Sequence, residues 1–443
     1  MTRTPDIAHS SQIQPASMKK TLLLWLSKLG PGLITGAADD DPSGIATYSQ
    51  GGAQYGFATL WTLFLTYPLM VGIQVISARI GCVTGHGLGT NIAKSNSRGV
   101  ATTLVALLLV ANTINIGADL AAMADAVQLV AGGPRHIYAV ALGLTCLLLQ
   151  VFIPYQRYVR VLKWLTLTLF AYVGTVFASH VPWGAVLHGT LFPRVEITPD
   201  YLLLIVAIFG TTISPYLFFW QAGQEVEELE VRQSKDSLRN SPQDALRQLR
   251  RINIDTALGM AFSNIIAFFI MLTTAVTLYT HGLHDIQTSA QAAEALRPIG
   301  GEFTFLLFAA GIIGTGMLAV PVLAGSAAYA VGETFRWPSS LGLRLNEAKY
   351  FYAIIAIATL VGVLLVFSPI DPVKALLWSA MINGVISVPL MLAMMRISTR
   401  QDIMGGFVIG TRLKWLGWLA TGVMAVTVLA FGLTSLAGYL KPD

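Results

Sequence analysis

Long apolar stretches separated by short polar loops run along most of the chain. A helix needs about 20 apolar residues to cross a bilayer, and the pattern supplies eleven such stretches. Two of them are interrupted by proline and small polar residues, and the longest charged segment follows the second of these. The predicted spans are 22–54, 57–81, 99–131, 136–154, 158–180, 199–223, 255–281, 302–332, 350–368, 373–395 and 415–439.

The first and sixth predicted spans are interrupted at equivalent places, at residues 41–44 (DPSG) and 211–215 (TTISP). A proline inside a helix removes one N–H and clashes with the carbonyl one turn earlier. Pro42 and Pro215 are therefore expected to break their helices. Unwound backbone at membrane depth is tolerated only where protein or a water-filled cavity satisfies it. The two breaks therefore predict a binding site inside the membrane.

This arrangement predicts an all-α polytopic membrane protein. Five spans begin with each break, which is typical of two inverted five-helix repeats, here at about 22–180 and 199–395, with an eleventh helix added. Residues 1–21 are polar and are expected to form a disordered cytoplasmic tail before a single transport domain at 22–443.

The charged stretch at about 224–254 is expected to be a cytoplasmic linker. Its simplest interpretation is a solvated helix between two parts of the domain. The alternative is an ion funnel or gate at the inner mouth, with Glu225, Glu227 and Glu228 as its acids.

Composition supports a membrane protein. The chain is 54% hydrophobic and only 12% charged, with a mean hydropathy of +0.64, whereas soluble domains carry about 25% charged residues. With the N-terminus inside, 23 of the 28 Lys and Arg residues fall on the inner side and 5 on the outer side. This bias predicts a cytoplasmic N-terminus and an outer C-terminus in the plasma or inner membrane. The net charge of +5 is thus a loop property and does not indicate a nucleic-acid partner.

Asp41 is the leading candidate for binding chemistry. The residue before a proline is disfavoured in the helical region, and Gly44 allows backbone to approach a bound group closely. A carboxylate at this depth is costly and marks a functional site. Asp39 and Asp40 precede it and are interpreted as vestibule residues that raise the local cation concentration.

The second break offers further oxygen ligands. Pro215 is expected to free carbonyls near Thr211 and Thr212, and Ser214 adds a hydroxyl. Hard divalent cations prefer carboxylate, carbonyl, hydroxyl and water oxygens. The alternative for each hydroxyl is a hydrogen bond back to the kinked helix.

These motifs resemble the NRAMP (natural resistance-associated macrophage protein) family of divalent metal transporters, which has a LeuT-like fold. The family pattern is Asp-Pro-Gly-Asn in the first span and Ala-x-x-Met-Pro-His in the sixth. Asp41, Pro42 and Pro215 are retained. By this resemblance Gly44 stands where the family has a metal-binding asparagine, and Thr211 where a backbone carbonyl binds metal.

The departures from the family pattern concern the choice of ion. Ser214 takes the methionine position, which removes a soft ligand that favours transition metals. Tyr216 takes the histidine position. Asp119 matches a family acid that is used in proton transfer, but Ala122 stands at the position of the family's second acid. These departures look like the NRAMP-related magnesium transporter branch, which is thought to work without proton coupling.

Asn383 in the tenth span lies near a family glutamine that joins the occluded site, so it is an accessory candidate with Thr212 and Tyr216. Asp119 is interpreted as a proton carrier, or otherwise as a buried acid with a structural partner.

The sequence therefore predicts transport of partly hydrated Mg²⁺, with Mn²⁺ as a second ion, by alternating access with weak or no proton coupling. The metal is a substrate, and no cofactor is expected. A proton-coupled transition-metal (Mn²⁺ or Fe²⁺) importer is the main alternative, and a symporter of an organic solute is a weaker one. An enzyme is not expected, because an intramembrane aspartyl protease would leave both broken helices unexplained.

Overall fold

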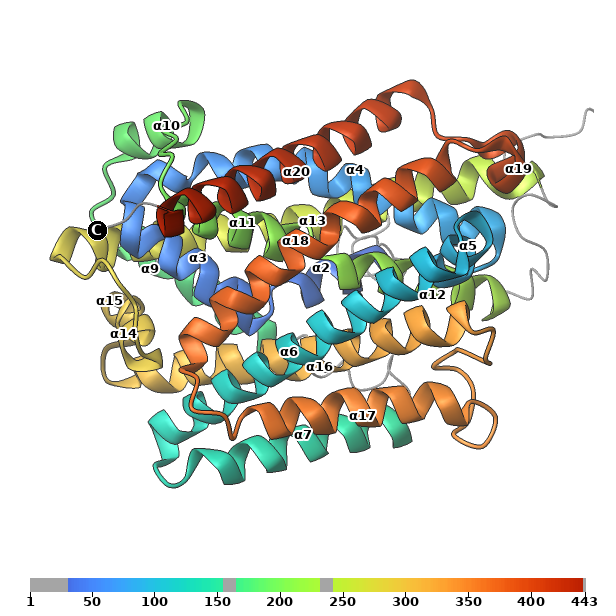
Figure 1. Cartoon of the computed structure of the whole chain (residues 1–443). Coiled ribbons are helices and arrows are strands. Elements are labelled where there is room, and N and C mark those ends of the chain that lie inside the picture. Colours follow the sequence, from blue (N-terminus) through green and yellow to red (C-terminus); the bar gives the residue numbers. More distant parts are fainter. Residues whose placement is uncertain (1–30, 154–164, 232–241, 441–443) are drawn as a thin grey trace, which may run out of the picture.

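The computed structural model describes residues 31–153, 165–231 and 242–440, which form helices and connecting loops and contain no strand. The helices run roughly along one common direction (Figure 1). Short helices lie at the two ends of the bundle, with α10, α14 and α15 at one end and α5 and α19 at the other. The longer helices are α2 (Pro31–Asp39), α3 (Pro42–Tyr55), α4 (Trp61–Thr84), α6 (Arg98–Ala131), α7 (Arg135–Phe152), α9 (Phe170–Ala178), α11 (Pro199–Thr212), α12 (Pro215–Val231), α13 (Pro242–Thr277), α16 (Thr304–Thr334), α17 (Lys349–Leu365), α18 (Pro372–Ser398) and α20 (Thr411–Leu440).

Short helices occupy the loops between the long ones. In the described residues they are α5 (Leu88–Ser95), α10 (Trp183–Leu191), α14 (Ser289–Glu294), α15 (Arg297–Gly300) and α19 (Gln401–Met404), with single 3₁₀ turns at Gly56–Thr59, Leu165–Leu169, Tyr279–His281, Gly301–Phe303 and Gly405–Phe407.

The predicted spans correspond closely to the observed helices. Within the described residues, eight helical stretches are long and apolar enough to cross a membrane, and the shorter helices at 167–178 and 349–365 are also apolar. The first predicted span is present as α2 and α3, and the fifth is described only from Leu165 onward. The predicted tail at 1–21 lies outside the described residues.

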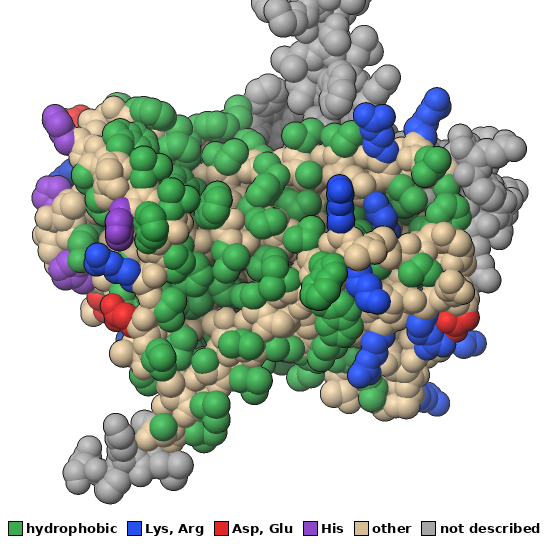
Figure 2. Space-filling model, turned by 90° about the horizontal axis from the view of Figure 1, so that it is seen from above, with side chains coloured by type: hydrophobic (Ala, Val, Ile, Leu, Met, Phe, Trp, Pro, Cys, Tyr) green, Lys and Arg blue, Asp and Glu red, His purple; other side chains and the backbone are tan. Residues whose placement is uncertain are grey.

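The surface has the pattern expected of a membrane protein. Figure 2 shows a broad band of hydrophobic side chains, with Lys and Arg gathered toward one end of the molecule. Exposed aliphatic and aromatic side chains such as Phe64, Val426 and Leu429, each more than 60% exposed, belong to this lipid-facing surface. The chain is therefore an integral membrane protein.

The predicted cytoplasmic linker is mostly helix. Residues 224–231 continue α12 and residues 242–254 begin α13, while 232–241 lie outside the described residues. Glu225 is buried, and Arg251 of α13 pairs with both Glu225 and Glu228 at 2.6 Å. The prediction of a solvated linker is therefore wrong for Glu225, which pairs with Arg251 inside the protein, whereas Glu228 stays partly exposed.

Both helix breaks lie where the sequence predicts them. Asp41 is extended (φ −74°, ψ 168°) and caps α3, with Pro42 at the first helical position, where its missing N–H costs nothing. α11 ends at Thr212, and α12 begins at Pro215.

Close packing holds the broken helices against their neighbours. A Cβ added to Gly36 of α2 would lie 2.2 Å from the Gly259 carbonyl of α13, and one added to Gly210 of α11 would lie 2.2 Å from the Ala380 carbonyl of α18. Glycine is required at both positions because backbone occupies the space a side chain would need. The two broken helices also meet each other, since the Tyr48 hydroxyl of α3 lies 3.0 Å from Oγ1 of Thr212 of α11.

Candidate functional site

Asp41 lies at the centre of the candidate site. Its side chain is 1% exposed, and Oδ1 accepts hydrogen bonds from the Gly44 amide at 2.7 Å and the Ser43 hydroxyl at 2.8 Å. These two bonds come from its own turn and are the capping geometry expected of an Asp-Pro helix start. They hold the carboxylate at the break between α2 and α3.

The other carboxylate oxygen of Asp41 faces α6 and α12. Oδ2 accepts a hydrogen bond from Nδ2 of Asn115 at 3.0 Å and a longer contact from the Tyr216 hydroxyl at 3.4 Å. The same Tyr216 hydroxyl lies 3.4 Å from the Ala38 carbonyl at the end of α2. No ion pair among the described residues includes Asp41, so its charge is balanced only by neutral donors.

Gly44 and Thr211 lie beside Asp41, as the sequence predicts. A Cβ on Gly44 would lie 3.1 Å from Oγ1 of Thr211 and 3.3 Å from Oδ1 of Asp41. The two oxygens therefore lie close to each other around the Gly44 backbone, with little room for a side chain. A carboxylate and a hydroxyl are both ligands that a hard cation accepts.

The hydroxyls of the second break bond back to their own helix. Ser214 Oγ lies 2.5 Å from the Thr211 carbonyl and 3.2 Å from the Gly210 carbonyl, and Thr212 donates to the Ile208 carbonyl at 2.6 Å. The structure thus shows the back-bonding that the sequence left as an alternative. In this conformation the Thr211 carbonyl already has a donor, while the Ser214 oxygen keeps lone pairs for a further contact.

The structure places Asp39 and Asp40 differently from the vestibule that the sequence predicts for them. Both are at most 2% exposed, and each accepts a contact from Ser263 of α13, at 2.7 Å to Asp39 and 3.0 Å to Asp40. They are therefore not exposed vestibule residues. The close packing of α2 on α13 turns these side chains inward.

Asn115 is the site residue that sequence reasoning missed. Its amide oxygen accepts a hydrogen bond from Ser379 of α18 at 2.7 Å, so it joins Asp41 to two helices far away in the chain. A buried asparagine in the middle of an apolar span was the available signal, since a buried polar side chain needs partners.

The tenth span contributes Ser379 to this network, one helical turn before the predicted Asn383. Asn383 is buried, and its Oδ1 has no hydrogen-bond partner among the described residues. No hydrogen bond joins Asn383 to Asp41 in the part of the chain that the structure describes. Its accessory role at the site stays a prediction.

Asp119 lies one turn beyond Asn115 on α6. It is completely buried, and neither carboxylate oxygen has a hydrogen-bond partner in the described ranges. Both interpretations of Asp119, as a proton carrier and as a buried acid with a structural partner, stay predictions.

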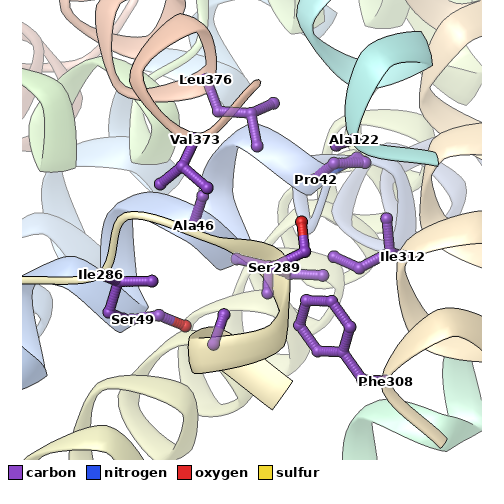
Figure 3. Close-up of a pocket in the computed structure, with 12 residues that line it drawn as sticks. Pro42, Ala46, Ser49, Ala122, Ile286, Ser289, Phe308, Ile312, Val373 and Leu376 are labelled. Carbon is purple, nitrogen blue, oxygen red and sulfur yellow. The ribbon is translucent and has the colours of Figure 1, made fainter. Parts of the chain in front are cut away.

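A small cavity lies beside the first break, between α3, α14 and α16 (Figure 3). Pro42 and Ala46 of α3 line it together with Phe308 and Ile312 of α16. Apart from Ser49 and Ser289 its lining is apolar. A mainly apolar space therefore separates the break from the end of the bundle that holds α14.

No group of three or more His, Cys, Asp or Glu side chains within the described residues could hold a metal ion. The arrangement instead offers one carboxylate, hydroxyls and broken-helix backbone, which suits a transiently bound ion that keeps part of its water shell.

Solved structures share this architecture. The manganese transporter of Eremococcus coleocola matches with a TM-score of 0.71 and 18% sequence identity, over 99% of this chain and 93% of that one. MHP1, a nucleobase-cation-symport-1 family transporter, matches with a TM-score of 0.56 and 12% identity, over 93% of both chains. Together with the two broken helices around a buried carboxylate, these matches define the class: an all-helical membrane protein with the LeuT-like fold.

Sequence comparisons identify the family. The model described as natural resistance-associated macrophage protein-like matches residues 32–434, and the chain belongs to this Nramp family. A divalent metal cation transporter, MntH, of Verminephrobacter eiseniae is 28% identical over 369 residues, covering 79% of this chain and 80% of that protein. The MntH of Mycobacterium tuberculosis H37Rv is 25% identical over 443 residues, covering 98% and 96%. The chain is therefore a transporter and not an enzyme, as its sequence predicts.

Proposed function

We propose that this chain moves divalent metal cations across the membrane by alternating access, with Asp41 as the charged ligand. The single observation that carries the proposal is the meeting of Asp41, Gly44 and Thr211 at two broken helices inside the membrane. The names of its relatives as divalent metal cation transporters agree with this chemistry. The metal is the cargo, and no cofactor is required.

The preferred ion is partly hydrated Mg²⁺, with Mn²⁺ as a second substrate. Ser214 supplies a hydroxyl in the second break, and no thioether or imidazole ligand stands in either break. Asp41 and Thr211 supply oxygen atoms beside Gly44, and Mg²⁺ usually binds few protein ligands because it dehydrates reluctantly and keeps several waters. A small set of oxygen ligands without sulfur or nitrogen therefore favours Mg²⁺ over softer ions.

Transport is proposed to proceed with weak or no proton coupling. Tyr216 in the second break does not titrate near neutral pH in its unperturbed form, unlike a histidine. Ala122 offers no carboxylate one turn beyond Asp119. A proton path that starts at Asp41 therefore lacks two titratable groups, one at the Tyr216 position and one at the Ala122 position.

The orientation follows from charge. The basic end of the bundle (Figure 2) is proposed to be cytoplasmic, which places the cavity of Figure 3 on the outer side. The N-terminus is then inside, the C-terminus outside, and the host membrane is the plasma or inner membrane.

A proton-coupled transition-metal importer is the second candidate. One observation favours it: the carboxylate of Asp119 is buried without a hydrogen-bond partner among the described residues, one turn from the asparagine that contacts Asp41. Such an acid is able to carry a proton if water reaches it.

The test is ion flux into proteoliposomes that contain the purified full-length chain, with Mg²⁺, Mn²⁺ or Cd²⁺ outside and a pH indicator inside. We expect Mg²⁺ and Mn²⁺ to enter without acidification of the lumen. Asp41→Ala should abolish flux, while Asp200→Ala, which removes an exposed carboxylate outside the site, should leave it unchanged. Undiminished flux in Asp41→Ala would overturn the proposal, and Cd²⁺ uptake with acidification would favour the second candidate.

A further inference from the structure

A cavity at the basic end of the bundle lies between α4, α13 and α20. Its volume is about 520 Å³. Two arginines line it: Arg79 near the end of α4 and Arg412 at the start of α20. It is separate from the ion site, because none of its lining residues belongs to α2, α3, α11 or α12.

The cavity carries positive charge that no acid among the described residues balances, since neither arginine forms an ion pair there. Arg79 donates to a neutral partner, Oδ1 of Asn253 at 2.9 Å, and its Nε is buried without a hydrogen-bond partner in the described ranges. Two guanidinium groups around one cavity repel each other unless an anion lies between them.

The start of α20 adds to this potential. Gly410 precedes the helix, and its carbonyl accepts a hydrogen bond from the Lys414 amide at 3.0 Å. Glycine has no side chain that could cap the remaining free N–H groups of the first turn. The exposed amides of a helix N-terminus attract anions. The arginine pair and this helix start therefore present donors to the same space.

The cavity also has an apolar lining. Val71 and Val75 of α4 and Leu413 and Leu416 of α20 contribute to it, and all but the buried Val75 are partly exposed. Trp415, one residue before Leu416, is 73% exposed, and tryptophan gathers at the level of the lipid headgroups. The cavity thus combines hydrogen-bond donors for an anion with an apolar surface that suits an acyl chain, at the depth of the lipid headgroups.

We propose that this cavity binds the phosphate of an anionic phospholipid, with its acyl chain along the valine and leucine wall. Basic pockets between membrane helices bind such headgroups by charge, and the bidentate guanidinium geometry suits phosphate oxygens. The bound lipid joins α20 to α4 and α13. Its place in the inner leaflet follows from the orientation proposed above, but its binding does not depend on ion transport.

The test compares lipids on the purified full-length chain in neutral detergent. We expect phosphatidylglycerol to raise the thermal unfolding midpoint more than phosphatidylcholine, and to be retained in native mass spectra. Arg79→Gln/Arg412→Gln should lose the difference between the two lipids. Arg400→Gln is the matched control, because it removes a basic charge whose partner is the exposed Asp402.

Two outcomes would overturn the proposal. One is an undiminished phosphatidylglycerol effect in Arg79→Gln/Arg412→Gln. The other is the same stabilisation by inorganic phosphate alone, which would show a free-anion site. If the double variant does not fold, Arg412→Gln serves instead, since this side chain is exposed, and it should lose at least half of the lipid-specific shift.

Discussion

Nδ2 of Asn115 donates a hydrogen bond to Oδ2 of Asp41 over 3.0 Å, although 74 residues separate them in the chain. An ionised carboxylate only accepts hydrogen bonds, so the amide must turn its NH₂ toward Asp41 and its oxygen toward Ser379. This orientation leaves the asparagine unable to act as an oxygen ligand for the same ion. Asn115 therefore positions the proposed ligand rather than binding the cation.

Replacing Asn115 tests this role. Asn115→Leu should raise the KM for Mg²⁺ about tenfold or more, because a hydrogen bond to a charged group contributes about 1.5–3 kcal/mol. Asn115→Asp should not restore uptake, because a second carboxylate repels Asp41. The measurement is initial Mg²⁺ uptake against concentration.

Asn112 provides the matched control for that substitution. It is buried on the same helix, and its amide donates to the Leu323 carbonyl and to Ser326 instead of Asp41. Asn112→Leu should lower thermal stability while leaving the KM unchanged. Equal changes of KM in the two variants would show that Asn115 acts through general packing alone.

Ser214 should set the preference between hard and soft ions. Ser214→Met replaces a hydroxyl by a thioether, which is a ligand for softer metals, so Cd²⁺ uptake should rise relative to Mg²⁺. Ser214→Ala is the control that removes the hydroxyl without adding sulfur. An unchanged ion ranking in competition uptake would place Ser214 outside the first ligand shell.

Tyr216 should compete with the cation for Asp41. Its hydroxyl makes only long contacts of 3.4 Å with Asp41 and the Ala38 carbonyl, and both oxygens are acceptors that a cation also seeks. Tyr216→Phe should therefore lower the KM for Mg²⁺ only a few-fold, because contacts of 3.4 Å are longer and weaker than an ordinary hydrogen bond to a carboxylate. A higher KM in the same uptake assay would mean that the hydroxyl supports the bound ion.

Gly210 should be essential for packing the second break. A Cβ there would lie 2.2 Å from the Ala380 carbonyl and 2.4 Å from the Gly384 amide nitrogen, and backbone cannot swing aside. Gly210→Ala should destabilise the protein by about 1–3 kcal/mol, as overpacking does. The readout is the thermal unfolding midpoint, with Gly422→Ala of α20 as the control, since nothing lies within 4 Å of its added Cβ. A midpoint equal to that of the control would contradict the close approach of α11 and α18.

The sequence by itself determined the spans and the breaks. Apolar length and proline position act locally, so α3 starts at Pro42 and α12 at Pro215, as predicted. The cap formed by Asp41 on Gly44 is equally local, because an aspartate before a proline is a helix-start signal that needs no tertiary partner.

Only the tertiary structure decided which side chains meet around Asp41. Membrane-spanning helices here are apolar on most faces, so the sequence pattern carries little information about which face meets which neighbour. The contacts of Asp39 and Asp40 with Ser263, and of Asn115 with Asp41 and Ser379, join residues 74 to 264 positions apart. Such contacts are fixed by close backbone approach at glycines such as Gly36 and Gly210, and that packing exists only in the folded bundle.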